Sequence, residues 1–436
     1  MTSAIVVGAG IGGLAAALGL LRAGQRVRVF EQVAALGEVG AGLSITPNAG
    51  KALRYLGLET ELERIGSRPP AGCIRHFKTG AVLVALPQDQ SRERYGMPLY
   101  HVHRADLHAS LLAAVQALDP QCIVTTAAVR HVQTTAGAAS VELQDGSRHE
   151  ADWLVGADGI HSVTRSSLFG PDRPNFTGYV AWRGLIPGEL VPPRLLDPPL
   201  CMTVGPRRLL MRYPLRRGTL VNFVAIARRS AWTEEGWSVR SDVDELLSEF
   251  DDFESHSLEL LRLTPADRLF KWGLFDRDPL PSWTSARATL LGDAAHAMPP
   301  FTGQGAVMAL EDGAVLGRVM STSQDIDKAL RRYESARHAR VTAALVMSRA
   351  RSELYFADDP QQQVQALGAG MAELRTLYDY DAGRDDAGKA FETQGVGCEK
   401  DMDRCRMIYL GMLAVPLLGW SASMTYGGRT HFFGLF

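Results

Sequence analysis

The apolar positions of the first thirty or so residues form two short runs, separated by a glycine-rich turn and an apolar helical stretch. Residues 4–7 (Ala-Ile-Val-Val) are apolar throughout, which is typical of a buried strand. Leu14 to Ala23 is rich in alanine and leucine and ends before Gly24, which predicts a helix. Residues 27–31 (Val-Arg-Val-Phe-Glu) predict a second strand, so the chain is expected to begin with a strand–helix–strand unit.

The rest of the chain alternates between short strand-like runs and helical segments. Asp106 is the expected N-cap of a helix over 106–118, and Asp145-Gly146 reads as a hairpin turn flanked by 141–143 and 153–155. Further strand-like runs fall at 74–77, 81–84, 180–183, 209–213, 220–225 and 288–291. Further helical patterns fall at 241–262, from near Gly305, and at 328–356.

The turn after the first strand contains Gly8, Gly10, Gly12 and Gly13. Glycine permits the tight turn at Gly8, a close approach of backbone to a pyrophosphate at Gly10, and close helix–strand packing at Gly13. The N-terminus of the helix then presents free amide groups to phosphate. Glu31 ends the second strand about twenty residues on, where a carboxylate accepts hydrogen bonds from ribose hydroxyls and repels a 2′-phosphate. The sequence therefore predicts a site for FAD or NAD, and not for NADP.

A second glycine-bearing segment follows the strand at 288–291 and is the most diagnostic part of the chain. The strand delivers Asp293 to its carboxyl end, where ligands bind in open α/β sheets and where a carboxylate can accept from ribityl hydroxyls. Pro300 follows, and then Gly303 and Gly305 open a helix. The bare amides of that helix can stabilise negative charge on a reduced flavin.

Two polar residues in these motifs, Asp158 and His296, each have two alternative roles. Asp158, in the Gly156–Gly159 turn after a short apolar run, either braces the cofactor-binding backbone or caps a local turn. His296 is expected to pack or hydrogen-bond near the cofactor, with a role as a catalytic base as the alternative.

These elements predict an α/β fold with an α+β second domain. A Rossmann-like domain is interrupted by a mainly β domain and followed by a helical C-terminal section. The expected boundaries are 1–72, 101–177 and 285–345 for the Rossmann-like domain, 73–100 and 178–284 for the mainly β domain, and 346–436 for the C-terminal section.

Composition narrows the class of protein. Hydrophobic residues make up 46% of the 436 residues and the net charge is −2, so no basic field favours a nucleic-acid partner. The five cysteines are scattered without a CxxC pair, which indicates neither a disulfide framework nor a metal site. Together with the absence of a signal peptide pattern at the N-terminus, this predicts a cytoplasmic protein.

One segment near the C-terminus departs from this picture. Residues 407–424 carry no charge, but they contain a proline, glycines and serines that suit a membrane span poorly. A buried segment or a partner interface is the preferred interpretation, and weak contact with a membrane surface or lipid is the alternative. The chain is expected to be a monomer or a homodimer.

Six blocks of sequence together resemble the single-component FAD-dependent aromatic hydroxylases, the family of p-hydroxybenzoate hydroxylase. Within it the likeness is greatest to salicylate hydroxylase, 3-hydroxybenzoate 6-hydroxylase and 6-hydroxynicotinate 3-monooxygenase. The blocks are GAGIGG (8–13), GEVGAGLSITPN (37–48), VHRADLH (102–108), GADGIHSVTR (156–165), GYVAWRGLIP (178–187) and LLGDAAHAMPPFTGQGAVMALEDG (290–313).

The resemblance implies an NAD(P)H-dependent flavoprotein monooxygenase that uses FAD, NADH or NADPH, and O₂ to hydroxylate an aromatic, phenolic acid-like substrate. Oxygen would pass to the ring from a flavin C4a-hydroperoxide, which decays to H₂O₂ where water is admitted. The Rossmann-like domain would bind FAD, and the mainly β domain the substrate. The implied cofactor-binding residues are Gly8, Gly10, Gly12, Gly13, Glu31, Gly42, Arg104, Asp158, Asp293, Pro300, Gly303 and Gly305.

Strands of the substrate domain are expected to face the flavin, so their polar residues are the candidates for substrate chemistry. Arg183 or Arg212 can pair with a substrate carboxylate, although a salt bridge elsewhere is the competing interpretation for each. The candidate substrate-binding residues are Arg212, Tyr213, Asn222 and Pro299, and the candidate catalytic residues are Tyr213, Arg183 and His101.

The chain departs from these relatives at the expected base. Leu209 and Leu210 stand where relatives acting on salicylate or 3-hydroxybenzoate place a histidine, and Leu43-Ser44-Ile45 stands where the hydroxynicotinate enzyme has one. A more hydrophobic site is therefore expected, with His101 or His103 replacing the lost base.

Two other functions stay open at this stage. One is a flavin monooxygenase of secondary metabolism or drug inactivation that acts on a bulky polycyclic or aromatic compound. The other is a FAD-binding protein without catalytic activity.

Overall fold

The computed structural model of the protein describes residues 2–37, 41–86, 90–232 and 239–384, which belong to one compact unit. The apolar segment 407–424 lies outside these residues, so the predictions of a buried segment, a partner interface or a membrane contact there stay predictions. Of the helices described, none has both the length and the hydropathy needed to cross a bilayer.

The first sheet is the Rossmann-like one. Over the described ranges it has six strands in the order β18-β19-β11-β1-β2-β7, and all neighbours are parallel except β18 and β19. The strands are β1 (Ser3–Val7), β2 (Arg26–Phe30), β7 (Ile123–Val124), β11 (Trp153–Gly156), β18 (Thr284–Ser285) and β19 (Ala288–Leu290).

Alternation along β1 explains how this sheet is covered on both faces. Ala4 and Val6 pack into a core shared with the helices, whereas Ile5 and Val7 pack against a small sheet on the other side. That small antiparallel sheet consists of β8 (Val129–Thr134), β9 (Ala139–Leu143) and β10 (Arg148–Ala151).

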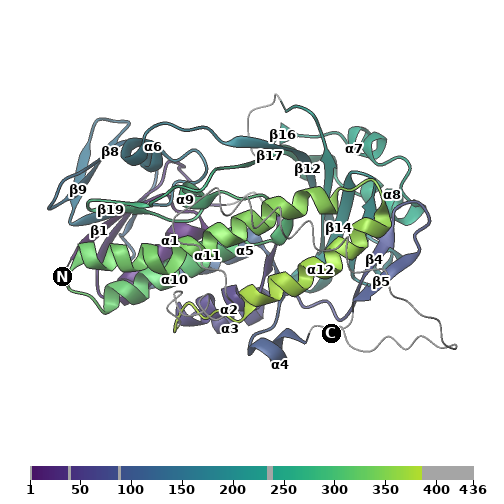
Figure 1. The fold of residues 1–436 in the computed structure, drawn as a ribbon, viewed down its shortest axis with the longest axis horizontal. Coiled ribbons are helices and arrows are strands. Elements are labelled where there is room, and N and C mark those ends of the chain that lie inside the picture. The colour runs from purple at the N-terminus through teal and green to yellow at the C-terminus, as the bar shows by residue number, and fades with distance from the viewer. Residues whose placement is uncertain (1, 38–40, 87–89, 233–238, 385–436) are drawn as a thin grey trace, which may run out of the picture. The chain divides into compact units, whose positions relative to one another are not determined.

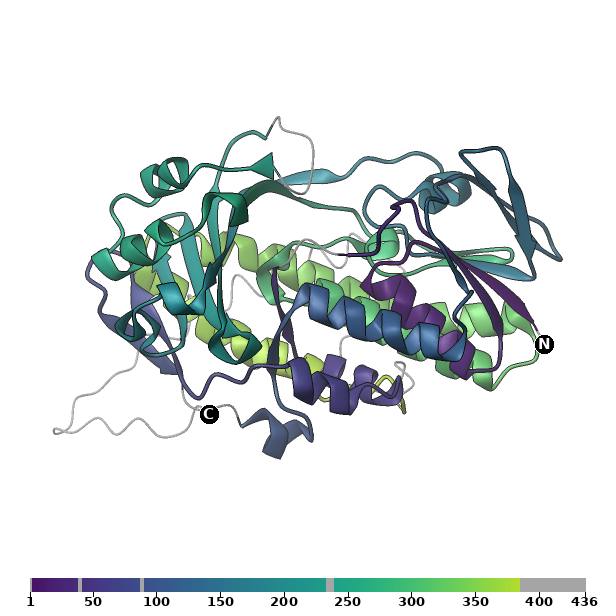
Figure 2. The same ribbon diagram turned by 180° about the vertical axis from the view of Figure 1, so that it is seen from behind.

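Three helices pack on the first face: α1 (Ile11–Arg22), α5 (Arg104–Leu118) and α10 (Gly305–Ser321). Figure 2 shows α5 beside α1. A Cβ at Gly19 of α1 would lie 2.7 Å from the carbonyl oxygen of Gly313 in α10. Glycine therefore permits these two helices to approach closely enough to bring their N-termini to the same edge of the sheet.

The second sheet is mainly antiparallel. In the described residues its eight strands run in the order β16-β17-β12-β15-β14-β13-β4-β5, and the β13–β4 pair is parallel. Its strands are β4 (Gly72–His76), β5 (Val82–Leu86), β12 (Asn175–Pro187), β13 (Leu200–Gly205), β14 (Arg208–Leu215), β15 (Leu220–Arg228), β16 (Val239–Arg240) and β17 (Leu269–Asp276). One face packs against α7 (Val243–Glu249) and α8 (Ser255–Arg262), whereas the other carries a separate apolar cluster.

A long helix joins the two cores. α11 (Ile326–Tyr355) packs Leu330 and Tyr333 into the core of the first sheet, and its last residue packs with Tyr179 on the second sheet. Figure 1 shows α11 running beside α10 and on toward the second sheet.

The smaller elements are β3 (Gly42–Ile45), β6 (Tyr100–His103), α2 (Pro47–Tyr55), α3 (Glu59–Ile65), α4 (Ser91–Tyr95), α6 (Val163–Phe169), α9 (Asp293–His296), α12 (Pro360–Tyr378), η1 (Gly188–Leu190), η2 (Pro193–Leu196), η3 (Arg216–Gly218), η4 (Ala266–Arg268) and η5 (Pro300–Thr302).

The predicted α/β fold class, with an inserted mainly β domain and a helical C-terminal section, is confirmed. Two local predictions were wrong. α5 begins at Arg104 with His103 as its N-cap, because β6 leads directly into the helix, and Asp106 lies in the first turn. The Asp145-Gly146 turn joins β9 to β10, whereas β11 is buried along its whole length and forms a central parallel strand.

The predicted domain boundaries stay a prediction. β18, which belongs to the first sheet, straddles the expected boundary between 284 and 285. α11 is continuous across the expected boundary between 345 and 346. The chain therefore has no break between elements at either expected boundary.

Candidate active site

The three glycine motifs converge because their strands are neighbours. β1 leads into Gly8, β11 ends at Gly156, and β19 leads into Gly292, in the spatial order β19-β11-β1. All three strands are parallel, so their carboxyl ends lie at one edge of the sheet, which is where ligands bind in open α/β sheets. Segments more than a hundred residues apart in sequence thus form one continuous edge.

The geometry of the first turn fits a dinucleotide pyrophosphate. Gly8 has φ of +97°, which favours glycine, and a Cβ at Gly13 would collide with the carbonyl oxygen of Gly8. A Cβ at Gly10 would have no heavy atom within 4 Å, so the backbone there is open to a ligand. No side chain of the described residues caps the N-terminus of α1, which leaves its amide groups available to an anion.

Glu31 lies at the end of β2 and holds the same turn. Its Oε2 accepts a hydrogen bond from the amide of Ala9 at 2.7 Å, and its Oε1 accepts from the amide of Val33 at 3.0 Å. The carboxylate is therefore placed beside the glycine turn, as expected for a residue near the ribose.

Asp158 is engaged within its own turn. Its oxygens accept from the hydroxyl of Ser162 at 2.6 Å and the amide of Thr164 at 2.9 Å, and burial raises its pKa. The preceding Ala157 lies against Gly8, since a Cβ at Gly8 would be 2.6 Å from the Ala157 carbonyl oxygen. Of the two interpretations for Asp158, the geometry shows the turn cap, and the capped turn in turn supports the glycine loop.

Arg104 and Asp293 come together from distant parts of the chain. Arg104 begins α5, and Asp293 is exposed at the start of α9. Burial lowers the pKa of Arg104, and the charge of Asp293 opposes that shift. Nearby, Gly303 has φ of +65°, and Gly305 begins α10 without a side-chain cap from the described residues. Pro300 is exposed beside them, whereas Pro299 is buried and its carbonyl oxygen accepts from Ser348 at 2.6 Å.

A cluster of buried charges lies under this edge, between α10 and α11. Arg337 donates to Asp312 at 2.7 Å and to Glu311 at 2.5 Å, and Arg340 donates to both oxygens of Glu311 at 2.9 Å. Asn48 also donates to Glu311, at 2.7 Å. We refer to Glu311, Asp312, Arg337 and Arg340 as the ion cluster.

His296 completes this arrangement. Its Nε2 lies 2.7 Å from Oδ2 of Asp312, which also accepts from the amide of Gly292. Burial by itself would raise the pKa of Asp312, but His296 and Arg337 together lower it to about 2. The histidine thus supports the third motif from inside through its contact with Asp312, and its place relative to the cofactor stays a prediction.

The sequence did not predict the charge pairs of the ion cluster, although it contained a signal of them. Glu311 and Asp312 interrupt a stretch that is otherwise apolar from Gly305 to Gly317, and Arg337 and Arg340 are three positions apart on another helix. Buried carboxylates require such partners, but nothing in the sequence specifies which arginines supply them.

On the second sheet, the face away from α7 and α8 carries the candidate substrate residues. Arg183, Tyr213 and Asn222 share this face with an apolar cluster that includes Leu209, Ile226 and Trp272, which we call the open face. The guanidinium of Arg183 lies 4.4 Å from the ring centre of Trp272. Its Nε is buried without a hydrogen-bond partner in the described part of the chain.

Tyr213 and Asn222 meet the segment that contains Gly42. Asn222 Oδ1 accepts from the amide of Gly42 at 2.8 Å, and a Cβ at Gly42 would collide with the hydroxyl of Tyr213. Burial raises the pKa of Tyr213 to about 12. The Nδ2 of Asn222 is buried and has no partner among the described residues.

His101 joins the same group from the β3–β6 pair. Its ring stacks on Tyr213 with centres 4.3 Å apart, and its Nδ1 lies 3.2 Å from the hydroxyl of Ser44. Ser44 occupies the segment where the hydroxynicotinate relatives carry their histidine, so His101 reaches that place from the neighbouring strand. Burial lowers the pKa of His103, two positions on.

The structure does not bring Arg212 into this group. Successive strand residues point to opposite faces, so Arg212 lies on the face packed against α7 and α8 while Tyr213 lies on the open face. Its Nη1 donates to the carbonyl oxygens of Pro198 and Pro199 at 3.0 and 3.1 Å. We therefore leave Arg212 out of the substrate site.

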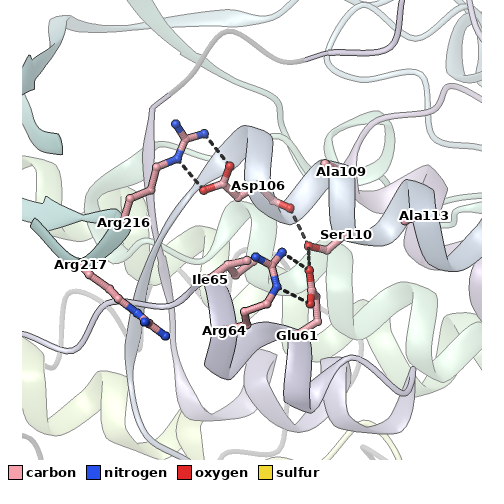
Figure 3. Close-up of a pocket in the computed structure, with 9 residues that line it drawn as sticks. All are labelled: Glu61, Arg64, Ile65, Asp106, Ala109, Ser110, Ala113, Arg216 and Arg217. Atoms are coloured by element: carbon pink, nitrogen blue, oxygen red, sulfur yellow. Dashed lines mark hydrogen bonds and ion pairs between the residues drawn. The ribbon is translucent and has the colours of Figure 1, made fainter. Parts of the chain in front are cut away.

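A pocket of about 500 Å³ lies elsewhere, between α3, α5 and the turn from β14 to β15 (Figure 3). Four of its five charged side chains form two pairs: Arg216 with Asp106 at 2.6 Å and Arg64 with Glu61 at 2.5 Å. These pairs leave little for a ligand to satisfy, and we assign none. The Arg216–Asp106 pair instead ties the end of β14, which carries Tyr213, to α5.

Comparisons with known proteins agree with this geometry. Residues 1–348 match the family described as FAD binding domain. The chain is 38% identical to 3-amino-4-hydroxybenzoate 2-monooxygenase of Streptomyces platensis over 86% of this chain and 93% of that one. It is 34% identical to 6-hydroxynicotinate 3-monooxygenase of Pseudomonas fluorescens over 81% and 92%. The crystal structure of Klebsiella pneumoniae HpxO complexed with FAD and uric acid matches with a TM-score of 0.76 at 28% identity, covering 89% of this chain and 96% of that one.

Proposed function

From the premise that this chain belongs to the FAD-binding family of flavoprotein aromatic monooxygenases, we propose that its substrate is a phenolic acid of the hydroxybenzoate type. The family predicted from the sequence is confirmed, and with it FAD as the cofactor. The two enzyme relatives are named for ring acids that carry both a carboxylate and a hydroxyl group. Those names lend no support to the alternative of a bulky polycyclic substrate.

The proposal rests on Arg183, a cation on the open face that has no carboxylate partner in the described part of the chain. Its Nε is buried on the open face, the side chain as a whole is half-buried, and none of the described carboxylates pairs with it. Burial lowers its pKa to about 10, so it remains a cation at neutral pH. A buried cation without a protein partner costs free energy unless a ligand supplies the anion. A substrate carboxylate can do so with two parallel hydrogen bonds.

The residues at the edge of the first sheet would hold the cofactor. The amide groups at the N-terminus of α1, opened by Gly10, would bind the pyrophosphate, and Glu31 the ribose. Arg104 and Asp293 would contact the middle of the molecule, and Gly303 and Gly305 would lie along the flavin. When bound there, FAD would supply the redox chemistry by which NADH or NADPH and O₂ add one oxygen atom to the ring.

His101 and Tyr213 are the proposed polar pair at the substrate hydroxyl. Tyr213 keeps its proton at physiological pH because its pKa is raised, so it donates a hydrogen bond rather than acting as a base. His101, oriented by the hydroxyl of Ser44, would accept the proton of the substrate phenol, which makes the ring more electron-rich. Asn222 would fix Gly42 against both side chains.

The test is a comparison of matched ligands on purified, FAD-loaded protein. NAD(P)H oxidation and product formation are measured with a hydroxybenzoate, an aminohydroxybenzoate, and the amide of each. We expect the acids to accelerate flavin reduction and to give a product carrying one oxygen atom from O₂, and the amides to do neither. Stimulation by polycyclic neutral ligands, with none by the acids, would overturn the proposal.

Variants at His101 test the base separately. His101→Ala should shift turnover from hydroxylated product toward H₂O₂, whereas His103→Ala should shift it less. Unchanged coupling in both variants would remove the histidines from the mechanism.

We also propose that the enzyme works in the cytoplasm, as a monomer or a homodimer.

A further inference from the structure

Two cysteines far apart in sequence face each other on the second sheet. Cys73 in β4 and Cys201 in β13 are register partners on neighbouring parallel strands. Both side chains are buried, and their sulfur atoms lie 3.6 Å apart. Adjacent strands bring Cα atoms to a separation that a disulfide bond can span, so no large backbone movement is needed to join the two.

Two arginines surround this pair. Arg212 lies opposite Cys201 in the strand register, and Arg75 follows Cys73 by two positions on the same face. Both are held in place by the turn at 197–199: Arg75 donates to the carbonyl oxygen of Asp197 at 2.7 Å, and Arg212 donates to those of Pro198 and Pro199. Fixed cations beside a thiol favour the thiolate, which is the reactive form.

The thiol of Cys73 responds to these neighbours. Its pKa is lowered to about 6, first by the hydrogen bond with Cys201 and then by Arg75, against the opposing effect of burial. The pKa of Cys201 is raised by the same pairing and by burial. One sulfur therefore tends to be a thiolate and the other a thiol.

A third buried cysteine shows what the cations contribute. Cys122 lies in the core of the first sheet, and burial raises its pKa to about 11. It is equally shielded from solvent, but the described residues give it no arginine comparable to Arg75 or Arg212. Burial alone thus makes a thiol inert, and the two arginines distinguish the pair on the second sheet.

We propose that Cys73 and Cys201 are a modification site, a dithiol that hydrogen peroxide closes to a disulfide. The oxidant is one that a flavoprotein monooxygenase itself releases when reduction is not followed by oxygen transfer. The site needs only peroxide, so it does not depend on which ring acid is the substrate.

The chemistry balances without another reactant. The Cys73 thiolate attacks one oxygen of H₂O₂, the O–O bond breaks, and the leaving hydroxide takes up a proton to become water. Cys201 then attacks the resulting sulfenic sulfur, the S–O bond breaks, and a second water leaves. The two sulfurs give up two electrons in total, and one H₂O₂ is reduced to two molecules of water.

The bond would fix one edge of the sheet. The hairpin of β4 and β5 meets the rest of the second sheet through β13, and the residues joined are 128 apart in sequence. Closing so long a loop restricts the unfolded chain strongly, so oxidation should raise the thermal midpoint. Ile74, next to Cys73, belongs to the cluster on the open face.

The experiment treats the full-length protein with reagent H₂O₂, quenches it by alkylation under denaturing conditions, and maps its peptides without reduction. We expect a Cys73–Cys201 cross-link that dithiothreitol reverses, while Cys122 stays alkylated. Cys201→Ser should trap Cys73 as a sulfenic acid that reacts with dimedone, and Arg75→Gln should slow the oxidation several-fold. Cys122→Ser is the matched control and should behave as the unmodified protein does.

Two results would overturn the proposal: oxidation of Cys122 as fast as Cys73, or full alkylation of Cys73 and Cys201 at peroxide doses that oxidise a model thiol. A second arm lets the enzyme consume NADH without substrate, with and without catalase. A cross-link with reagent peroxide but none during turnover would reject the flavin as the source of the oxidant. It would leave the aromatic substrate to be judged by its own test.

Discussion

The molecule contains two buried polar regions that solve the same problem in opposite ways. In the ion cluster, two carboxylates and two arginines pair with one another between α10 and α11, and Asn48 and His296 give the carboxylates further partners. On the open face, Arg183 and Asn222 each keep a buried nitrogen without a partner in the described part of the protein. Both regions remove charged groups from water, yet only in the first do the described residues pair every buried carboxylate with an arginine.

This difference separates scaffold from site. Burying a polar group is costly unless it finds a partner, so a satisfied network is expected to stabilise the fold and an unsatisfied group is expected to await a ligand. We infer from this that the ion cluster holds the third motif in place, and we propose that the open face would receive the substrate. Substitutions in the ion cluster should therefore lower the free energy of unfolding, whereas substitutions on the open face should lower enzyme activity.

The largest effect should come from breaking the ion cluster. Arg337→Met leaves Asp312 and Glu311 buried with fewer cationic partners, and we expect it to lower the free energy of unfolding by about 3–5 kcal/mol. Urea unfolding followed by circular dichroism measures this. Arg331→Met, on the exposed side of the same helix, is the control and should stay within about 0.5 kcal/mol of the parent. Equal stability of the two variants would contradict the argument.

Arg183→Met should show the reverse pattern. No protein carboxylate loses a partner, so the free energy of unfolding should change by less than about 1 kcal/mol. The loss of charged hydrogen bonds to a substrate carboxylate, about 1.5–3 kcal/mol, should lower kcat/KM for the acid roughly 10- to 100-fold. Steady-state kinetics with the acid and its amide measure this. A loss of stability like that of Arg337→Met would place Arg183 in the scaffold.

Tyr213→Phe should have a smaller effect and no influence on the pH profile. Burial disfavours the phenolate and raises the pKa of Tyr213 to about 12, so the hydroxyl stays protonated below about pH 11. Removing one neutral hydrogen bond, worth about 0.5–1.5 kcal/mol, should lower kcat/KM roughly 2- to 12-fold. The pH dependence of kcat/KM between pH 6 and 10 should keep its shape. An ionisation that vanishes in the variant would show that Tyr213 titrates in this range.

The smallest effect should come from a pair that is satisfied but exposed. Arg216 and Asp106 keep 45% and 23% of their side chains accessible, so water screens their attraction. Asp106→Asn should cost at most about 1 kcal/mol of unfolding free energy, and less at high salt. Thermal melts at two salt concentrations measure this. A salt-independent cost as large as that of Arg337→Met would mean that burial is not what distinguishes the pairs.

The sequence by itself determined much of the predicted cofactor-binding edge of the first sheet. Glycines in a strand–turn–helix context carry a conformational requirement that can be read without a structure, and Asp293 follows its strand directly. Because these motifs are local, the predicted fold class and FAD binding did not depend on knowing any long-range contact. The pattern did not show, however, that residues 153–156 join the first sheet and not a hairpin, since strand pairing is decided by distant partners.

Tertiary structure alone decided the polar pairings. Arg212 and Tyr213 are adjacent in sequence but lie on opposite faces, and only the packing of α7 and α8 establishes which face is covered. The same holds for the arginines of the ion cluster, for His101 against Tyr213, and for the sulfur atoms of Cys73 and Cys201. Backbone requirements are local and leave a trace in the sequence, whereas hydrogen bonds and charge pairs are made across space and become visible only when the chain has folded.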